Sequence, residues 1–351
     1  MRKLEDEKDT VYSCSKCGLC QSVCPIYKIT KNDCTVSRGH FIMLSGLIKG
    51  DLKMSNKLNR YLDLCLKCSA CSKFCPSGID VVDIVALAKA EYFKSSSWEK
   101  FISFFQKIFF FNIVLKSKNL FTKEIESKKF DKKVLYFGGC KNKLSGNSYV
   151  VKILNSCGIE VITPDFDCCG IPFFVRGDLE NFDNCMQKVL KTIKKYGNID
   201  IVTTCASCEK TLKSYKKWDS DLNINVKNIF QYIRENHLSL KLKEKKSVTF
   251  HKPCNIENFQ DILWILNNTD NLEYKEMENY DECCGLNGLT KLREYKIMLN
   301  LFKLKRNNII ESGTKTVLTS CLGCETALKA FALWKYKVED FSEFLAKYII
   351  D

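Results

Sequence analysis

Residues 15–27, SKCGLCQSVCPIY, decide the fold of the first part of this chain. With the residue before them, they place four cysteines within eleven positions and end the run on a proline. Residues 65–78, CLKCSACSKFCPSG, repeat the same spacing. The cysteines of the two runs are Cys14, Cys17, Cys20 and Cys24, then Cys65, Cys68, Cys71 and Cys75.

The spacing C-x₂-C-x₂-C-x₃-C-P is the one that bacterial two-cluster ferredoxins use to bind [4Fe–4S] clusters. Three cysteines at two-residue gaps wrap around three corners of a cube, and the fourth ligates the other cluster. Structural zinc, the alternative, uses two cysteine pairs with a longer gap between them. We therefore predict two [4Fe–4S] clusters, one on Cys14, Cys17, Cys20 and Cys75, the other on Cys65, Cys68, Cys71 and Cys24.

The composition agrees with clustered metal ligands. The chain has 351 residues, 45% of them hydrophobic and 27% charged, with 21 cysteines. Its opening, MRKLEDEKDT, has no apolar segment of a secretory signal, so we expect a cytoplasmic protein with reduced thiols. A disulfide framework is not expected in that compartment.

The formal net charge is +14, and metal-bound thiolates would lower it. A lysine-rich, solvated surface explains most of this excess. The alternative explanation is a functional one, in which the positive charge attracts an acidic partner or an anionic membrane. No nucleic-acid-binding motif accompanies the charge, so a nucleic-acid partner is not predicted.

Residues 98–121 are rich in phenylalanine, but charged residues interrupt them before they reach the about 20 apolar positions of a membrane span. They predict an amphipathic helix. We expect this helix to pack against its own protein, and lying on a membrane surface is the alternative. Membrane contact would then be peripheral at most, on the inner face of the membrane.

After residue 130 the pattern changes to short apolar strands that alternate with helices, as in KKVLYFGGC and NIDIVTTCASC. The pattern then recurs 114 to 116 residues later, as in KSVTFHKPC and KTVLTSCLGC, which indicates a duplication. The fold class is therefore α+β and multidomain. The predicted parts are a helical ferredoxin domain at 1–95, a Phe-rich linker at 96–130, and two duplicated α/β lobes at 131–243 and 244–351.

Each lobe carries five cysteines in the order C…CCG…CxxC. Two cysteines of each lobe follow strands closely, namely Cys140 and Cys205, then Cys254 and Cys321, so these four are expected at the carboxyl edge of a sheet. Cys208 and Cys324 fall where a helix begins, and the helix dipole there favours a thiolate. A thioredoxin-like motif would explain only two cysteines per lobe, and no C-x-x-C is followed by the His of a c-type haem. The two sets are Cys140, Cys168, Cys169, Cys205 and Cys208, then Cys254, Cys283, Cys284, Cys321 and Cys324.

Other residues near these cysteines have open roles. His251 precedes Cys254 and is a candidate catalytic proton donor or substrate contact, or else a hydrogen-bond donor behind a ligand. Arg38 follows the first run and either faces a cluster or an anion, or lies on the surface. Cys34 is expected as a buried free thiol.

The two ferredoxin runs followed by two CCG repeats resemble a known family of Fe–S oxidoreductases. It includes the iron–sulfur subunit of glycolate oxidase, the B subunit of heterodisulfide reductase and the C subunit of anaerobic glycerol-3-phosphate dehydrogenase. The resemblance covers nearly the whole chain and all eighteen ligand-type cysteines. One departure is VSRGH, where the glycolate oxidase pattern reads Ser-Pro-Arg-Gly-Arg.

The resemblance implies an electron-transfer subunit that serves an FAD-containing dehydrogenase, with a quinone or small carrier as acceptor. It also implies one or two further iron–sulfur centres at the CCG sets, and glycolate or lactate as the oxidised substrate. The chain has no G-x-G-x-x-G after a strand and no P-loop, so the flavin is expected on a partner. A disulfide reductase with a noncubane CCG centre, and a non-redox iron–sulfur sensor, are the alternatives.

Overall fold

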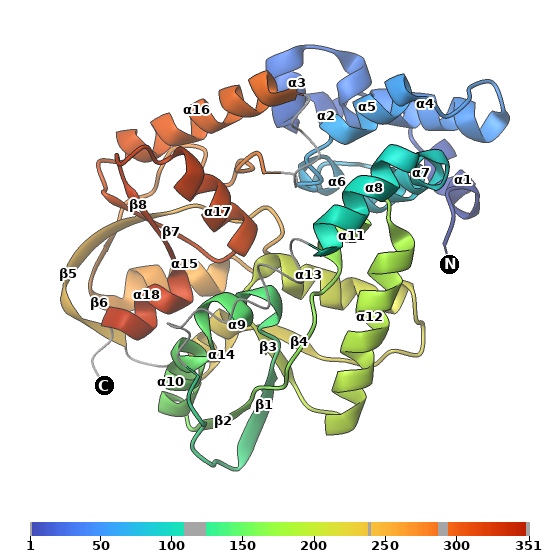
Figure 1. Ribbon diagram of the computed structural model, residues 1–351. Helices are drawn as coiled ribbons and strands as arrows, with labels where there is room; N and C mark the ends of the chain where they lie inside the picture. The colour runs from blue at the N-terminus through green and yellow to red at the C-terminus, as the bar shows by residue number, and fades with distance from the viewer. Residues whose placement is uncertain (1, 109–123, 238–239, 287–293, 349–351) are drawn as a thin grey trace. The chain divides into compact units, whose positions relative to one another are not determined.

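The computed structural model describes residues 2–108, 124–237, 240–286 and 294–348 (Figure 1). These residues belong to two compact units. The helical unit comprises Met1–Gln106, Gly170–Asp183 and Glu282–Leu304. The sheet unit comprises Lys107–Cys169, Asn184–Asp281 and Lys305–Asp351.

Short helices joined by cysteine-bearing loops make up most of the helical unit. Pro25 opens one of these helices directly after Cys24, where its missing N–H is not needed. As expected for a helical domain, helices lie between the two runs and directly after the second run. The helices of this unit are α1 (Lys8–Tyr12), α2 (Leu19–Val23), α3 (Pro25–Thr30), α4 (Ser37–Lys49), α5 (Asn56–Leu64), α6 (Ala70–Lys73), α7 (Val81–Ser95), α8 (Ser97–Gln106) and α11 (Ile171–Phe174).

The first part of the Phe-rich segment forms α8, and residues 109–121 of the predicted helix lie outside the described residues. Helix α8 does pack against its own unit, through Glu99 and Ser103, but its aromatic side chains take no part in this packing. Trp98, Phe101, Phe104 and Phe105 are each more than half exposed. Among the described residues, no helix has both the length and the apolar character that crossing a bilayer requires.

Two four-stranded parallel sheets organise the sheet unit (Figure 1). Their strand orders are equivalent, β2-β1-β3-β4 and β6-β5-β7-β8. In each sheet the chain order reverses between the two central strands, which is where open α/β sheets build their sites. The strands are β1 (Lys132–Tyr136), β2 (Ile159–Ile162), β3 (Ile201–Thr203), β4 (Val226–Asn228), β5 (Leu240–Phe250), β6 (Thr269–Tyr274), β7 (Thr316–Thr319) and β8 (Lys337–Asp340).

The central strands are apolar because parallel sheets are covered on both faces. Val134, Leu135 and Tyr136 of β1 are at most 1% exposed, and β3 is buried throughout. The α/β architecture predicted for this part is therefore confirmed. The helices between these strands are α9 (Gly139–Ser145), α10 (Ser148–Ser156), α12 (Leu179–Ile193), α13 (Ala206–Ser214), α14 (Ile229–Glu235), α15 (Gln260–Asn268), α16 (Tyr295–Glu311), α17 (Leu322–Phe331) and α18 (Phe341–Tyr348).

Helices of the two sheets pack on each other within the sheet unit. Helix α10 contacts α18, and α14 contacts α15. Phe230 and Phe341 stack with ring centroids 5.0 Å apart. A buried ion pair joins Lys141, which follows the first cysteine of one set, to Asp340 at the end of β8. The domain boundaries and the duplication stay predictions.

Candidate metal centres

The two ferredoxin runs have the same local backbone. Lys16 and Gly18 have positive φ angles of 57° and 86° in the first run. Lys67 and Ser69, at the matching positions of the second run, have φ angles of 54° and 61°. A left-handed conformation costs a residue with a side chain about 1–3 kcal/mol and persists only where the surroundings impose it. Both loops therefore wrap in the same way.

The first run surrounds a cavity together with the end of the second run. Arg38 and the N-terminus of α4 also line this cavity, so the arginine does face the predicted cluster position. The backbone N–H of Arg38 donates to Cys20, although burial raises the pKa of that thiol. The cysteines that line the cavity are Cys14, Cys17, Cys20, Cys71 and Cys75.

A second cavity lies beside Cys24, Cys65, Cys68 and Cys71. Ser37 lines both cavities, and its side chain is hydrogen-bonded to Cys71. The four cysteines proposed for each cluster thus lie around one cavity, and Cys71 lines both cavities. Four thiols around a cavity are the donor set of a [4Fe–4S] cluster, so the residues fit that group.

The ionisation of these thiols depends on their burial. Burial raises the pKa of Cys24 to about 12 and also raises the pKa of Cys71. The exposed Cys17 differs, because the backbone N–H of Leu19 lowers its pKa. Burial therefore keeps the thiols of Cys24 and Cys71 protonated without metal, and iron has to displace their protons.

A cysteine of the second CCG set lies in the helical unit, next to the second ferredoxin run. The thiol groups of Cys68 and Cys283 are hydrogen-bonded, and this contact, with burial, raises the pKa of Cys68 well above its usual value. No feature of the sequence indicated the contact, because 214 residues separate the two positions.

The first CCG set comes together in the sheet unit. Cys168 is hydrogen-bonded to Cys140 and Cys169. Cys208 is hydrogen-bonded to Cys169, at an Sγ–Sγ distance of 3.6 Å, and to Cys205. Five thiols therefore form one connected cluster, which is one more than a cubane needs. Tetrathiolate iron sites and larger iron–sulfur centres both fit this donor set.

Two residues around this cluster were not identified from the sequence. The Tyr215 hydroxyl donates to the Cys169 carbonyl oxygen at 2.8 Å, and the side chain is fully buried. Cys185 is 8% exposed and close enough to the set that burial and Cys169 raise its pKa to about 12. Tyr215 fixes the backbone between the vicinal cysteines and the following glycine.

The first turns of α13 and α17 meet in the sheet unit. Cys205 and Cys321, the residues that precede these helices, are hydrogen-bonded to each other. The Ala206 N–H donates to the Ser320 carbonyl oxygen at 2.9 Å, and the Ser207 hydroxyl lies 3.2 Å from Cys321 Sγ. The two CCG sets are therefore adjacent at their C-x-x-C segments.

This junction decides which thiol ionises. Hydrogen bonds from Cys205, Cys324 and Ser207 lower the pKa of Cys321 well below its usual value. The helix dipole was expected to favour the thiolate at Cys208, but the pKa of Cys208 is raised, because Cys169 and Cys205 crowd it in a buried site. Local hydrogen bonds thus outweigh the helix terminus.

The second CCG set divides between the units. Cys254, Cys321 and Cys324 belong to the sheet unit, whereas Cys283 and Cys284 belong to the helical unit. His251 follows β5 and is fully buried, and burial and the charge of Lys305 lower its pKa well below its usual value.

The imidazole of His251 is therefore neutral. One ring nitrogen lies within 4.8 Å of Cys324 Sγ. Among the described residues, neither ring nitrogen of His251 has a hydrogen-bond partner, so the neutral imidazole lies beside this candidate ligand without a hydrogen bond to it.

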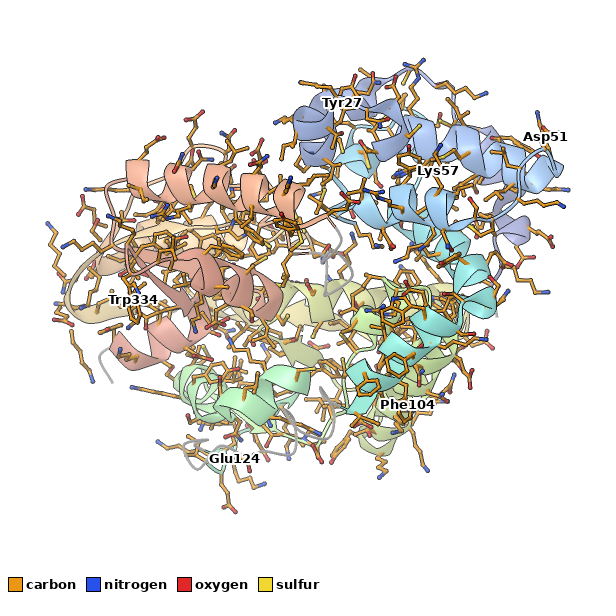
Figure 2. The ribbon with its side chains drawn as sticks, turned by 45° about the horizontal axis from the view of Figure 1, so that its top comes forward. Tyr27, Asp51, Lys57, Phe104, Glu124 and Trp334 are labelled. Carbon is orange, nitrogen blue, oxygen red and sulfur yellow. The ribbon has the colours of Figure 1, made fainter. Side chains whose placement is uncertain are left out.

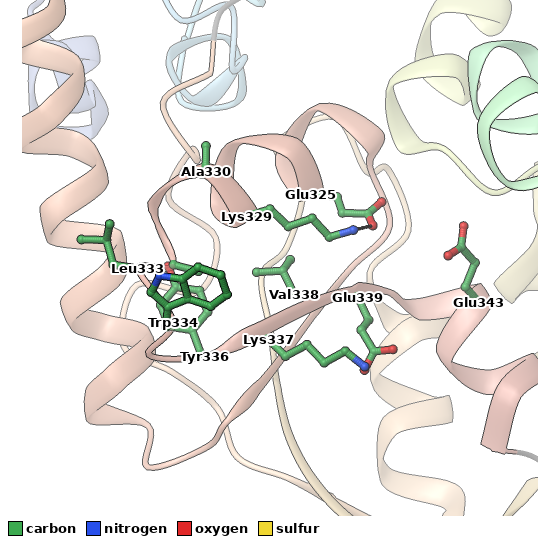
Figure 3. Close-up of a pocket in the computed structure, with 11 residues that line it drawn as sticks. Glu325, Lys329, Ala330, Leu333, Trp334, Tyr336, Lys337, Val338, Glu339 and Glu343 are labelled. Carbon is green, nitrogen blue, oxygen red and sulfur yellow. Dashed lines mark hydrogen bonds and ion pairs between the residues drawn. The ribbon is translucent and has the colours of Figure 1, made fainter. Parts of the chain in front are cut away.

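A pocket of about 530 Å³ lies between α17, β8 and α18 (Figure 3). Its walls carry the ion pairs Lys329–Glu325 and Lys337–Glu339, at 2.5 and 3.0 Å. Trp334 at its rim is fully exposed. No cysteine lines this pocket, so it is separate from the thiol clusters.

Comparison with known families agrees with these clusters. The family model described as a 4Fe-4S dicluster domain matches residues 10–79. The model described as a cysteine-rich domain matches twice, at residues 134–213 and 248–329. The fold and the thiol clusters thus define an iron–sulfur protein of the oxidoreductase class.

Several proteins similar to this chain are iron–sulfur proteins or subunits of oxidoreductases. An uncharacterised iron–sulfur protein of Methanococcus maripaludis is 25% identical over 95% of this chain and 71% of its own length. The probable glycolate oxidase iron-sulfur subunit of Bacillus subtilis is 22% identical over 92% of this chain and 89% of its own. A subunit of the dihydromethanophenazine:CoB–CoM heterodisulfide reductase of Methanosarcina acetivorans is 22% identical over 90% and 88%. This chain belongs to the family of CCG-domain iron–sulfur oxidoreductase subunits that these proteins represent.

Proposed function

We propose that this chain is the electron-transfer subunit of a flavin-linked oxidoreductase that oxidises a 2-hydroxyacid such as glycolate or lactate. Oxidation of a 2-hydroxyacid to a 2-oxoacid releases two electrons and two protons, which a flavin on an FAD-containing partner can accept. Iron–sulfur clusters held by the cysteine sets supply one-electron transfer. A quinone or another small carrier is the final acceptor in this proposal.

The contact between Cys68 and Cys283 is the observation that carries the proposal. It joins a thiol of the ferredoxin set to a thiol of a CCG set inside one unit. Within the sheet unit, Cys321 of the second set contacts Cys205 of the first set. Because electron transfer slows steeply with distance, adjacent thiol sets of this kind suit a relay.

The residues around the thiols have supporting roles in the proposal. The N–H of Arg38 and the hydroxyl of Ser37 donate hydrogen bonds to sulfur, which raises the reduction potential of a bound cluster. His251 is proposed as a neutral hydrogen-bond donor to the Cys324 sulfur once that sulfur binds metal. Two [4Fe–4S] clusters, with one or two further centres at the CCG sets, are the proposed complement.

Turnover of the metal-loaded chain tests the relay. Photoreduced free flavin serves as the electron donor, and menadione, a soluble quinone, serves as the acceptor. Cys283→Ser should keep the EPR signals of the ferredoxin clusters and lower flavin-to-quinone turnover about tenfold or more. Cys34→Ser, a thiol outside all the sets, is the control. Equal turnover in the two variants would overturn the relay.

The five connected thiols of the first CCG set favour a second candidate, a heterodisulfide reductase-like enzyme. A pure relay does not need the fifth thiol, whereas an enzyme that cleaves a disulfide needs room for substrate sulfur. Adding a small disulfide or thiol to the reduced protein separates the two candidates. A changed CCG signal in EPR would support the second candidate, and an unchanged one supports the relay.

The equivalent strand orders of the two sheets support the proposed duplication. Each sheet places one cysteine after each of its two central strands, as copies of one ancestral unit would. A cytoplasmic location, peripheral on the inner face of the membrane, belongs to the same proposal.

A further inference from the structure

Helix α8 is attached to the helical unit by its polar side. Glu99 forms an ion pair with Arg176 at 2.8 Å, and the arginine is 2% exposed. Ser103 donates a hydrogen bond to Asp178, and both side chains are 2% exposed. Both partners lie in Gly170–Asp183, which belongs to the same unit.

The aromatic side of α8 faces the opposite way. Trp98, Phe101, Phe104 and Phe105 are 55%, 52%, 59% and 52% exposed. At 100° per residue, these four positions fall within an arc of roughly 120°, and Glu99 and Ser103 lie on the other side of the helix. An ordinary surface helix packs its apolar side against the core and exposes its charged side to water. Helix α8 has the opposite orientation, because its polar side packs against the unit and its aromatic side is exposed.

The four aromatic residues form one continuous patch, which we call the α8 aromatic face. Ring centroids of Trp98 and Phe101 are 5.8 Å apart, those of Phe101 and Phe105 are 4.6 Å apart, and those of Phe104 and Phe105 are 6.1 Å apart. The face surrounds Phe104, which is labelled in Figure 2. Contiguous exposed apolar patches usually mark a binding surface.

We propose that the α8 aromatic face inserts into the interface of an anionic phospholipid bilayer. Half of each ring amounts to about 400 Å² in all, below the roughly 800 Å² that each partner buries in a stable protein interface. Shallow insertion of an amphipathic helix needs no larger area and no matching partner surface. Trp and Phe are also residues that membrane interfaces favour.

The positive charge of the protein favours anionic lipids over neutral ones. Lys100, which borders the α8 aromatic face, is exposed, and the described residues give it no ion pair. The chain as a whole carries a formal net charge of +14. Each basic residue close to an anionic surface strengthens membrane binding, and salt weakens this contribution.

Vesicle flotation of the metal-loaded, full-length chain tests the proposal. The protein should float with phosphatidylcholine/phosphatidylglycerol vesicles several-fold more than with phosphatidylcholine alone. Phe101→Ser/Phe105→Ser should lower the partition coefficient about tenfold or more, because it removes two inserting rings. Trp334→Ser, which removes a fully exposed aromatic residue of the sheet unit, should leave binding unchanged.

The flotation results distinguish membrane binding from loss of folding and from a protein interface. The four rings face solvent, so the double variant should keep the iron content and circular dichroism of the parent. The proposal is overturned if the parent protein does not float, or if the double variant floats as well as the parent. Loss of binding to a flavoprotein partner in the double variant, without any vesicle binding, would mark a protein interface instead. Flotation needs no electron transfer, so this test and the test of the proposed relay fail independently.

Discussion

Removing the ammonium group of Lys141 should weaken the sheet unit strongly. Its Nζ lies 2.5 Å from Asp340 and 3.4 Å from Glu343, and the Lys141 and Asp340 side chains are 3% and 1% exposed. The ring of Tyr149 lies 5.1 Å from the same ammonium. Lys141→Met keeps the aliphatic packing and leaves the Asp340 carboxylate buried without its cation. Breaking a buried ion pair on one side costs about 3–5 kcal/mol.

The expected effect on thermal unfolding follows from the size of the unit. For a domain of 150–250 residues, 1 kcal/mol shifts Tm by about 2–4 °C, so Lys141→Met should lower Tm by about 6–20 °C. Circular dichroism melts of the metal-loaded protein under anaerobic conditions measure this shift. Asp340 also accepts from the Ser342 and Glu343 N–H groups, so Asn keeps this helix cap. Lys141→Met/Asp340→Asn should therefore recover most of the loss.

Lys129→Met supplies the matched control, because Lys129 pairs with Glu160 at 2.8 Å but its side chain is 88% exposed. An exposed ion pair contributes little, so Tm should stay within about 2 °C of the parent. The reasoning fails if Lys141→Met shifts Tm no more than this control. It also fails if the double variant is as unstable as the single one.

Three further predictions concern the helical unit. Gly39→Ala should destabilise the protein by about 1–3 kcal/mol, because its Cβ would lie 2.0 Å from the Asp33 carbonyl oxygen. Gly46→Ala in the same helix meets only the movable Leu52 side chain and should be neutral or stabilising in the same melts. Cys24→Ser should lower the iron content by about four atoms per chain, whereas Cys34→Ser should not. Loading Fe²⁺ at pH 7 should release about one proton fewer in a pH-stat for Cys24→Ser than for the parent, because burial raises the pKa of Cys24 to about 12, and equal release would contradict this reasoning.

Local spacing predicted the two ferredoxin loops, and the cysteines proposed for each cluster lie around one cavity. The gaps between Cys14, Cys17 and Cys20 span single turns, so backbone geometry alone restricts where their thiols can point. The alternation of strands and helices likewise indicated the parallel sheets, with Cys205 and Cys321 after central strands. Both patterns arise from neighbours along the chain.

Contacts between distant residues could not be predicted in this way. The pairs Cys68–Cys283, Cys205–Cys321 and Lys141–Asp340 depend on how helices and sheets pack, and one sequence carries no record of that packing.

Helix α8, which has ten residues, shows both a property that its sequence determined and one that the tertiary structure decided. Its sequence determined that one side is aromatic and the other polar, and hydrophobicity alone would place the aromatic side inward. Only the tertiary structure, through the buried partners Arg176 and Asp178, decided that the polar side faces the protein. A buried arginine and a buried carboxylate need partners at fixed positions, and satisfying them outweighs the burial of the rings.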